Sequence, residues 1–568
     1  MPFFFNGRLW TTPAVMSVVD DSAMYNRNTT GGNVLAIIGS AIGGEPKTAI
    51  RFGSPSEART VLIGGESLKA IEKAFDPSSD VNGPSEIVFV RVDPADQAAL
   101  TLADGSTNDV IDLVSSGYGA YFNAVKVKIE TGTDVGKKLT SQLGNDYYSD
   151  DNVARDVFSV TYTGANGTAT IAVSQTQVIL TDAATTTIEL SDYPTVQQLI
   201  DRIGAVTGWS ASVLDGNGEH ATLNALDNRA AVTAKNVTVT LTANLQAVID
   251  WFNSNSEGFL TATRSVGGGA VPANIGFTYL SGGANGTVTN SDWQDCFDAL
   301  QTEDVQWVVP ISSSSSIHAM ADTHAAYMSG VARLERRVMV GGNTGVTDAQ
   351  AIAAAKAINS DRTSYVHMGV YDYDDAGSLT LYPPYITAAM VAGMFSGSNP
   401  GTPMTNKSLK VRGVERNLRN PTDTDQLVKG GVLAIENATN GFRVVKSIST
   451  WLTNANYNRV EVSVGVSMDF VSRSVRNALD SLKGAKGSPA LLSEAVSRTD
   501  SILRELSIAE PVGPGILVGD KINPPFKGIE ARLEGDVVRV EFQCSPGIPV
   551  NYIPIVLHAQ PWSGSASI

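Results

Sequence analysis

The chain has 568 residues and a mass of 59.8 kDa, a length that allows about three or four domains. Hydrophobic residues make up 42% of the chain and charged residues 17%. This composition is apolar enough to form large cores and excludes a wholly disordered chain. The formal net charge of −16 has the wrong sign for a nucleic-acid binder, and two cysteines, Cys296 and Cys544, exclude a disulfide framework or a thiolate zinc site. No apolar run approaches the ~18 residues of a membrane span, and no secretory signal opens the chain, so we expect cytosolic synthesis.

The first region, up to about Asp93, has the pattern of an α/β fold. Asn33–Gly39 and Ile87–Val92 are continuous apolar runs, as expected of strands buried on both faces. Ser54–Phe75 between them has helical spacing of apolar residues. Strand, helix and strand at this separation predict a parallel βαβ unit.

The second region, from about Pro94 to Ala284, is rich in Thr, Ala, Asn and Gly and predicts one or two small β-rich domains inserted into the α/β frame. Thr195–Val206 is its one convincing helix. Short alternating runs predict strands at Val125–Ile129, Val157–Tyr162, Thr170–Val173 and Val237–Leu241.

The third region, from about Gly286, returns to an α/β pattern. A helix capped by Asn290 or Ser291 places Trp293, Phe297 and Leu300 on one face. Further strands are predicted at 305–311, 338–340, 365–371, 432–435 and 442–448, and further helices at 317–336, 347–358, 468–482 and 489–506.

Catalytic and metal-binding patterns are weak. The chain has five histidines, of which His318 and His324 share a predicted helix, but a spacing of six places them on different faces. We interpret all five, including His220, His367 and His558, as ordinary surface or capping residues. No nucleophile elbow occurs, and nothing singles out a carboxylate pair, so we predict no enzyme, cofactor or metal site.

One glycine-rich loop partly resembles a phosphate-binding loop. Gly39–Gly44 follows a buried strand, as a phosphate-binding loop does, but Glu45 and Pro46 stand where a Walker loop needs Lys and Ser or Thr. A tight turn that leaves the strand is the favoured interpretation.

Basic residues cluster on an otherwise acidic chain. The usual explanation is a solvated face or pairing within the molecule, and the alternative is docking on an acidic patch of a neighbour. The candidates for such contact are Lys407, Lys410, Arg412, Arg416 and Arg419, together with Arg498 and Arg504 on the helix 489–506.

Each end of the chain carries an isolated strand-like segment. Residues 13–25 include Val15, Val18 and Val19, and the far end includes Tyr552, Ile553, Ile555, Val556 and Leu557, interrupted by Pro554. Proline removes a ladder donor, so the second segment should pair at a sheet edge. Such strands either fold onto their own domain or join the sheet of another chain.

An ordered series of segments resembles the tail sheath proteins of contractile-tailed bacteriophages, a family shared with R-type bacteriocins and other contractile injection systems. YLSGGANG at 279–286, leading into a helix and 305–310, is the most specific part. The others are 34–44 with 87–91, 117–130, 406–431 with 442–451, and 522–557. The series covers most of the chain and is weakest over about 130–275.

The resemblance implies a structural virion protein whose subunits form stacked hexameric rings around an inner tail tube and contract to deliver the genome. It implies contacts with copies of the chain, the tube, the baseplate and the tail terminator or neck proteins, without nucleic acid or membrane insertion, and assembly in the host cytoplasm. Val538, Val540 and Phe542 would belong to the sheet that accepts a neighbour's strand.

In the terms of that family, the chain divides into a discontinuous α/β core with an inserted β-rich domain and extended arms. The expected segments are an N-terminal arm (1–30), a core in two parts (31–94 and 285–420), an inserted outer domain (95–284), a C-terminal inner domain (421–545) and a C-terminal arm (546–568).

Three alternatives stay open. A bacteriocin or injection-system sheath would carry the same signals. A secreted carbohydrate-binding adhesin would account for the Thr- and Gly-rich middle but not for the buried strands that flank it. A nucleotide-dependent enzyme would account for the α/β frame, but its loop lacks the required lysine.

Overall fold

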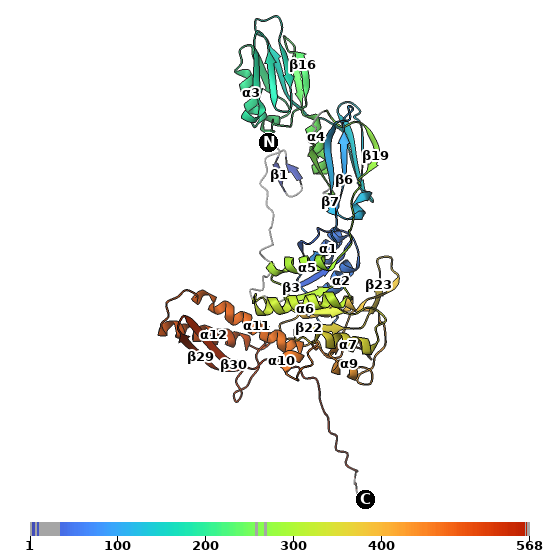
Figure 1. The fold of residues 1–568 in the computed structure, drawn as a ribbon, viewed down its shortest axis with the longest axis vertical. Helices are drawn as coiled ribbons and strands as arrows, with labels where there is room; N and C mark the ends of the chain where they lie inside the picture. The colour runs from blue at the N-terminus through green and yellow to red at the C-terminus, as the bar shows by residue number, and fades with distance from the viewer. Residues whose placement is uncertain are drawn as a thin grey trace. The chain divides into compact units, whose positions relative to one another are not determined.

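The computed structural model describes residues 34–255, 259–265, 270–562 and 564, and the backbone of two short strands, β1 (Phe3–Phe5) and β2 (Arg8–Trp10), which pair antiparallel (Figure 1). The described chain forms two compact units. The first is built mainly from residues 94–287 and the second from residues 34–41, 46–93 and 288 onward. The predicted strand residues Val15, Val18 and Val19, with most of the expected N-terminal arm, lie outside the described residues.

A seven-stranded sheet forms the centre of the second unit (Figure 1). The strand order is β26-β22-β21-β20-β3-β5-β4, and every pair is parallel except the one between β5 and the edge strand β4. The strands are β3 (Val34–Gly39), β4 (Ala49–Phe52), β5 (Glu86–Arg91), β20 (Trp307–Pro310), β21 (Arg337–Gly341), β22 (Thr363–Val366) and β26 (Val432–Leu433).

The two strands predicted near the start of the chain are confirmed as β3 and β5. Leu35, Ile37 and Phe89 are fully buried, and β3 pairs with β5 in parallel register. Side chains on both faces of these strands are covered, which is why the sequence shows a continuous apolar run rather than alternation. The edge strand β4 is short and half-exposed.

Helices surround this sheet. The helices of the second unit are α1 (Pro55–Leu62), α2 (Glu66–Phe75), α5 (Asn290–Ala299), α6 (Ser315–Gly330), α7 (Asp348–Ile358), α8 (Pro384–Ser396), α9 (Asp425–Lys429), α10 (Tyr457–Val460), α11 (Val462–Leu479) and α12 (Pro489–Leu506). None of the described helices combines the length and apolarity needed to cross a bilayer.

Three local predictions need correction. The single helix expected over 54–75 is two helices, because Ile63 and Gly65 have φ values of 64° and 106° and stop the helical path between them. The cap of α5 is Thr289, which forms a capping box with Asp292. The strand expected over 365–371 is divided between β22 and β23 (Val370–Tyr373), which belong to different sheets.

Helix α8 is buried along its whole length and was not predicted. It packs against α2 so closely that a Cβ on Gly393 would lie 2.4 Å from the carbonyl oxygen of Ala74. A Cβ on Gly341 of β21 would lie 2.1 Å from the backbone nitrogen of Tyr385. Two glycines therefore set the depth at which this helix lies against the sheet.

Three smaller antiparallel sheets complete the second unit. They contain β23, β24 (Leu379–Tyr382) and β25 (Gly413–Val414); β27 (Ile435–Ala438) and β28 (Gly441–Val444); and β29 (Phe526–Glu534) and β30 (Val537–Cys544).

The first unit consists of antiparallel sheets with few helices. Four sheets have the orders β10-β9-β8-β19, β18-β7-β6, β15-β11-β17 and β14-β13-β12-β16. Their strands are β6 (Gln97–Ala103), β7 (Asp109–Tyr118), β8 (Lys126–Thr131), β9 (Lys137–Leu143), β10 (Asp146–Val153), β11 (Asp156–Tyr162), β12 (Thr170–Val173), β13 (Gln177–Thr181), β14 (Thr185–Glu189), β15 (Trp209–Val213), β16 (Arg229–Thr233), β17 (Val239–Thr242), β18 (Leu260–Arg264) and β19 (Ile275–Tyr279).

Two helices accompany these sheets, α3 (Val196–Gly204) and α4 (Asn244–Asn255). The predicted helix is confirmed as α3, which Thr195 caps in a capping box with Gln198. Leu199 and Ile203 of this helix pack into a separate core with strands β11 to β13. The mixed α/β and β-rich fold class predicted from the sequence is thus confirmed.

Candidate assembly surfaces

Helix α11 ties the C-terminal part of the chain to the central sheet. Its first turns are buried, and Gly465 lies directly against the guanidinium of Arg337, where a Cβ would be 2.2 Å from Nη2. One turn later, Asp469 accepts hydrogen bonds from Arg337 and Arg362 at 2.9 and 2.7 Å. The first half of α11 is therefore held to strands β21 and β22 by a carboxylate shared between two guanidinium groups.

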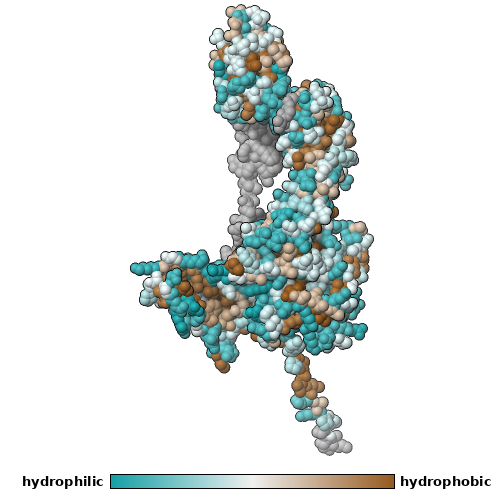
Figure 2. All heavy atoms as spheres, in the orientation of Figure 1, coloured by the Kyte–Doolittle hydropathy of each residue, from teal (hydrophilic) through white to brown (hydrophobic). Residues whose placement is uncertain are grey.

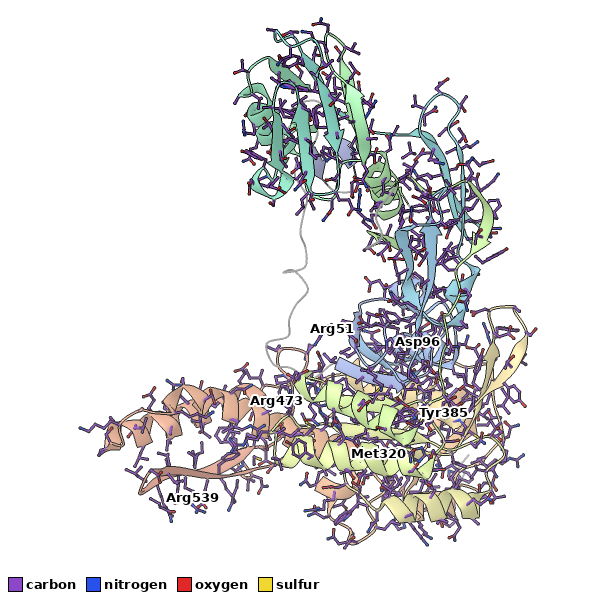
Figure 3. All side chains as sticks on the ribbon, turned by 45° about the horizontal axis from the view of Figure 1, so that its top comes forward. Arg51, Asp96, Met320, Tyr385, Arg473 and Arg539 are labelled. Atoms are coloured by element: carbon purple, nitrogen blue, oxygen red, sulfur yellow. The ribbon has the colours of Figure 1, made fainter. Side chains whose placement is uncertain are left out.

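A second set of ion pairs continues along the same helix. Arg473 lies 2.7 Å from Asp304, and Arg476 lies 2.6 Å from the buried carboxylate of Glu335. Figure 3 labels Arg473 on α11. These contacts fix the helix to the loops before β20 and β21.

Beyond this anchorage, the C-terminal part has a small core of its own. Phe470 and Val471 of α11 pack with Leu503 and Leu506 of α12, and with Ile516. Val475 and Leu517 also belong to the buried set. Phe526, Ile529, Phe542 and Cys544 of the β29–β30 hairpin are partly buried against it. So few buried side chains give this core limited stability of its own.

The β29–β30 hairpin presents unpaired strand edges. It is a two-stranded sheet, and among the described residues no third strand joins either side. The residues of β30 alternate between exposed and half-buried, and Val538, Val540 and Phe542 are on the half-buried side. Arg539, labelled in Figure 3, belongs to the exposed set. Unpaired edges of this kind are templates for strand addition.

The root of the C-terminal arm is attached to its own chain. Pro546 forms a bridge with Leu517, and the backbone N–H of Gly547 donates to Ile516. Further on, Asn551 Nδ2 donates to Glu461 Oε1 at 2.9 Å. Glu461 is buried and also pairs with Lys446 at 3.0 Å.

After Asn551 the arm is apolar and exposed. No strand or helix is formed between 545 and 562, and Ile553, Ile555 and Leu557 are 78%, 84% and 86% exposed. Figure 2 shows hydrophobic atoms along the segment that leads to the C terminus. The other predicted arm residues, Tyr552 and Val556, are exposed to a similar extent. A contiguous apolar patch of this kind marks an interaction site.

The predicted basic cluster is largely paired within the chain. Lys410 pairs with Asp76, Arg416 pairs with Asp348 at 2.6 Å, and Arg412 lies 5.4 Å from the ring centre of Tyr373. On α12, Arg498 and Arg504 form ion pairs one turn away with Glu494 and Asp500, as ordinary surface helices do. No ion pair is recorded for Lys407 or Arg419 among the described residues, although the backbone N–H of Arg419 donates to Asp423.

Three histidines are buried, which corrects the prediction of surface residues. His318 Nε2 donates to the Ser312 carbonyl at 2.9 Å, and His324 Nε2 lies 2.9 Å from Arg336 Nη1. Burial, and then Arg336, lower the pKa of His324 to about 3. Burial, and then Arg416, lower the pKa of His367 to about 4, against an opposing effect of Asp348. These side chains are core groups held neutral, and no group of described His, Cys, Asp and Glu residues has the arrangement of a metal site.

The glycine-rich loop after β3 is closed by the chain itself. The carboxylate of Asp93 accepts from the Ala41 N–H and from Arg91 Nε, each at 3.0 Å. The Ala41 N–H is therefore already hydrogen-bonded to a carboxylate, whereas a phosphate-binding loop would leave such an N–H free to bind its ligand.

Comparison with known proteins is consistent across sequence and fold. Residues 286–450 match the phage tail sheath protein central domain. The chain is 29% identical to the tail sheath protein of Bacillus phage SP01, over 99% of this chain and 97% of that protein. It is 28% identical to the putative tail sheath protein of Enterococcus phage phiEF24C, over 82% and 84% of the two chains.

The fold is also shared with solved structures. The sheath tail protein from Desulfitobacterium hafniense superposes with a TM-score of 0.56 at 13% identity, covering 94% of this chain and 96% of that one. The sheath tail protein from Listeria innocua gives a TM-score of 0.55 at 13% identity, with 90% and 92% covered. A match over nearly the whole length shows that the α/β core and the β-rich unit together have the fold of these sheath tail proteins. Residues 286–450 thus carry the phage tail sheath protein central domain, and the chain as a whole is similar to phage tail sheath proteins, as its sequence indicated.

Proposed function

We propose that this chain polymerises through its arms into stacked hexameric rings around an inner tail tube, and that contraction of this sheath drives the tube through the host envelope for genome delivery. The observation that carries the proposal is the apolar, exposed segment after Asn551, which follows a root fixed to its own chain. The sheath would assemble in the host cytoplasm and meet the baseplate at one end and the tail terminator or neck proteins at the other.

The arm matches an unpaired strand edge in length and chemistry. Residues 552–557 span about 20 Å when extended, and the eight residues of β30 span about 26 Å. Burying one Val, Leu or Ile side chain contributes about 1.5–3 kcal/mol, so several such residues can offset the cost of ordering the arm. Pro554 lacks an N–H, which suits a strand that pairs on one side only. The hairpin with Val538, Val540 and Phe542 is the proposed acceptor.

Strand exchange between copies is a head-to-tail contact. Such contacts generate a helix when the rotation between subunits does not close a ring, and stacked rings when neighbouring rings are linked. Arms that pivot at a fixed root allow whole subunits to rotate without breaking the ladder hydrogen bonds. Stored interface free energy in a kinetically trapped extended form would then drive contraction.

The basic residues are the proposed contacts with the tube or with a neighbour. Lys407 and Arg419 are the stronger candidates, because Lys410, Arg416, Arg498 and Arg504 already have carboxylate partners within the chain.

The test is a pair of C-terminal deletions. Removal of 553–568 leaves Pro546, Gly547 and Asn551 with their partners, and should leave a folded subunit that no longer forms tubes in negative-stain electron microscopy. Removal of 563–568 keeps the apolar segment and should leave polymerisation intact. Tubes formed by the longer deletion with unchanged length and yield would contradict the proposal.

A further inference from the structure

A small cavity lies where the central sheet meets helix α11. It is lined by Trp307 of β20 and Phe395 of α8, whose ring centres are 4.7 Å apart in a stacked arrangement, and by Arg336, which comes just before β21. Phe470 and Arg473 line it from α11, and Figure 3 labels Arg473 on that helix. We call this space the junction cavity. Its volume of about 40 Å³ has room for a water molecule or one small ion.

Arg336 is a buried cation that neutral acceptors hold. It is 1% exposed, and its two Nη nitrogens donate to the carbonyl of Leu300 at 3.0 Å, to that of Glu303 at 2.8 Å and to His324 Nε2 at 2.9 Å. The carboxylate of Glu303 pairs instead with Arg51. Among the described residues, Arg336 forms no ion pair, and its Nε has no hydrogen-bond partner.

A buried charge is costly unless it is both paired and hydrogen-bonded. Burial lowers the pKa of Arg336 only to about 10, so the guanidinium stays charged at pH 7. It therefore lacks a counter-charge, and one of its donors lacks an acceptor. A single anion beside Nε would supply both.

The charged groups around the junction cavity carry an excess of positive charge. Three carboxylates belong to the ion pairs along α11, each already bound by one or two guanidinium groups: Asp304, Glu335 and Asp469. They face five guanidinium groups, those of Arg336, Arg337, Arg362, Arg473 and Arg476. This balance favours an anion over a cation or a neutral occupant.

We propose that the junction cavity binds a small monovalent anion of the halide type, chloride in ordinary solution, with Arg336 Nε as its hydrogen-bond donor. A chloride ion is only slightly larger than a water molecule, so its size suits a space of about 40 Å³. The bound ion contacts the central sheet through Arg336 and lies beside α11, so it strengthens the junction between them. This site is independent of the arms and of the proposed strand exchange.

Thermal unfolding of the full chain in mixed salts tests the site. Sodium chloride replaces sodium gluconate stepwise, up to about 150 mM and at constant total salt, because gluconate is too large for the junction cavity. An ion that binds the folded chain alone stabilises it by mass action, so the unfolding midpoint should rise by about 2–4 °C and level off as the site fills. Bromide should act as chloride does. An unchanged midpoint, or a rise that never levels off, would overturn the proposal and leave water as the occupant.

Substitutions test the residues. Arg336→Met removes the donor and the buried charge, and should abolish the chloride-dependent rise whatever its own midpoint in gluconate. Arg504→Met is the matched control, because that arginine is exposed and pairs with Asp500 one turn away, and it should keep the full rise. An equal rise in Arg336→Met and in the original chain would overturn the proposal.

A second variant applies even if Arg336→Met does not fold. The carboxylate of Asp304 is 56% exposed, so Asp304→Asn should fold, and it increases the positive excess around the junction cavity. The chloride concentration that gives half of the rise should fall about two- to fivefold. A half-saturating concentration that is not lower than in the original chain would contradict the part assigned to the charge balance and overturn the proposal.

Discussion

Arg337 on β21 donates a hydrogen bond from Nε to Asp469 on α11 at 2.9 Å, its Nη2 lies 2.9 Å from the same oxygen, and the two residues are 132 positions apart in the sequence. Arg337 is buried, and its side chain is only 6% exposed. Burial lowers the pKa of its guanidinium, and the charge of Asp469 opposes that effect. The pair therefore joins the central sheet to the helix that carries the proposed arm and acceptor hairpin.

Asp469→Ala should destabilise the folded chain by about 3 kcal/mol, because it leaves the buried Arg337 charge without its carboxylate. Chemical denaturation would measure the change. Asp500→Ala is the matched control, because it removes an exposed carboxylate from a one-turn pair with Arg504 and should cost about 0.5 kcal/mol or less. Equal losses in the two variants would show that the Arg337–Asp469 pair does not hold α11.

The glycine in the middle of α8 gives a second prediction. Gly393→Ala should destabilise the protein by about 1–3 kcal/mol, because the new Cβ would meet backbone atoms of Ala74 that cannot move aside easily. Gly204→Ala is the control, because Gly204 is also a helical glycine without a positive φ but has open space around it. Helix propensity predicts a small gain there, up to about 1 kcal/mol. Thermal unfolding of the two variants should therefore shift in opposite directions.

The same helix shows what the sequence could and could not predict. Strands β3 and β5 were recognised because burial on both faces leaves an unbroken apolar run between glycines or turns. Helix α8 is buried on every side, so it has no polar face and its sequence shows no helical period. Prolines at 383 and 384 begin the helix, where proline is favourable, but a proline pair alone does not identify a helix start.

The candidate site was predicted unevenly for a related reason. The apolar residues around Pro554 could be recognised from the sequence, because they form a strand-like run and no neighbouring segment has the pattern of a hairpin partner. Contacts such as Asn551 with Glu461 depend on residues 90 positions apart, and no local pattern reports them. The surroundings of His324 on α6 depend in the same way on contacts outside that helix, because Phe297 lies on α5 and Arg336 lies just before β21. Whether the arm residues pair with another copy stays a prediction.

The two cysteines should differ in reactivity. Cys296 is fully buried, and burial raises the pKa of its thiol to about 12, so it should not react with iodoacetamide in the folded protein. Cys544 on β30 is half-buried, and burial also raises its pKa, so it should react slowly. Mass spectrometry should find at most one label in buffer and two in urea. The Cys544→Ser variant should take no label until it unfolds; labelling of Cys296 in the native variant would contradict its burial.

Acid should weaken the fold through the buried histidines. The pKa of His367 is about 4 in the folded chain against an ordinary value of 6.5, so the unfolded chain binds more protons below pH 6.5. The stability that neutral His367 provides is complete above about pH 6.5, declines as the pH falls, and is fully lost near pH 4. At pH 4.5 the penalty from this residue is about 2 kcal/mol. His324, with a pKa of about 3, acts in the same direction.

Urea unfolding at pH 7 and at pH 4.5 would measure this loss. Asp292 does not titrate in that window, because its hydrogen bond from Thr289, and then Lys47, hold its pKa at about 2. His367→Phe replaces a ring whose nitrogens have no recorded hydrogen-bond partner among the described residues, and should reduce the loss between the two pH values by about 2 kcal/mol. His558→Phe changes an exposed histidine and should leave the loss as it is in the original chain. If His367→Phe lost as much stability in acid as His558→Phe, protonation of His367 could not be a cause of acid unfolding.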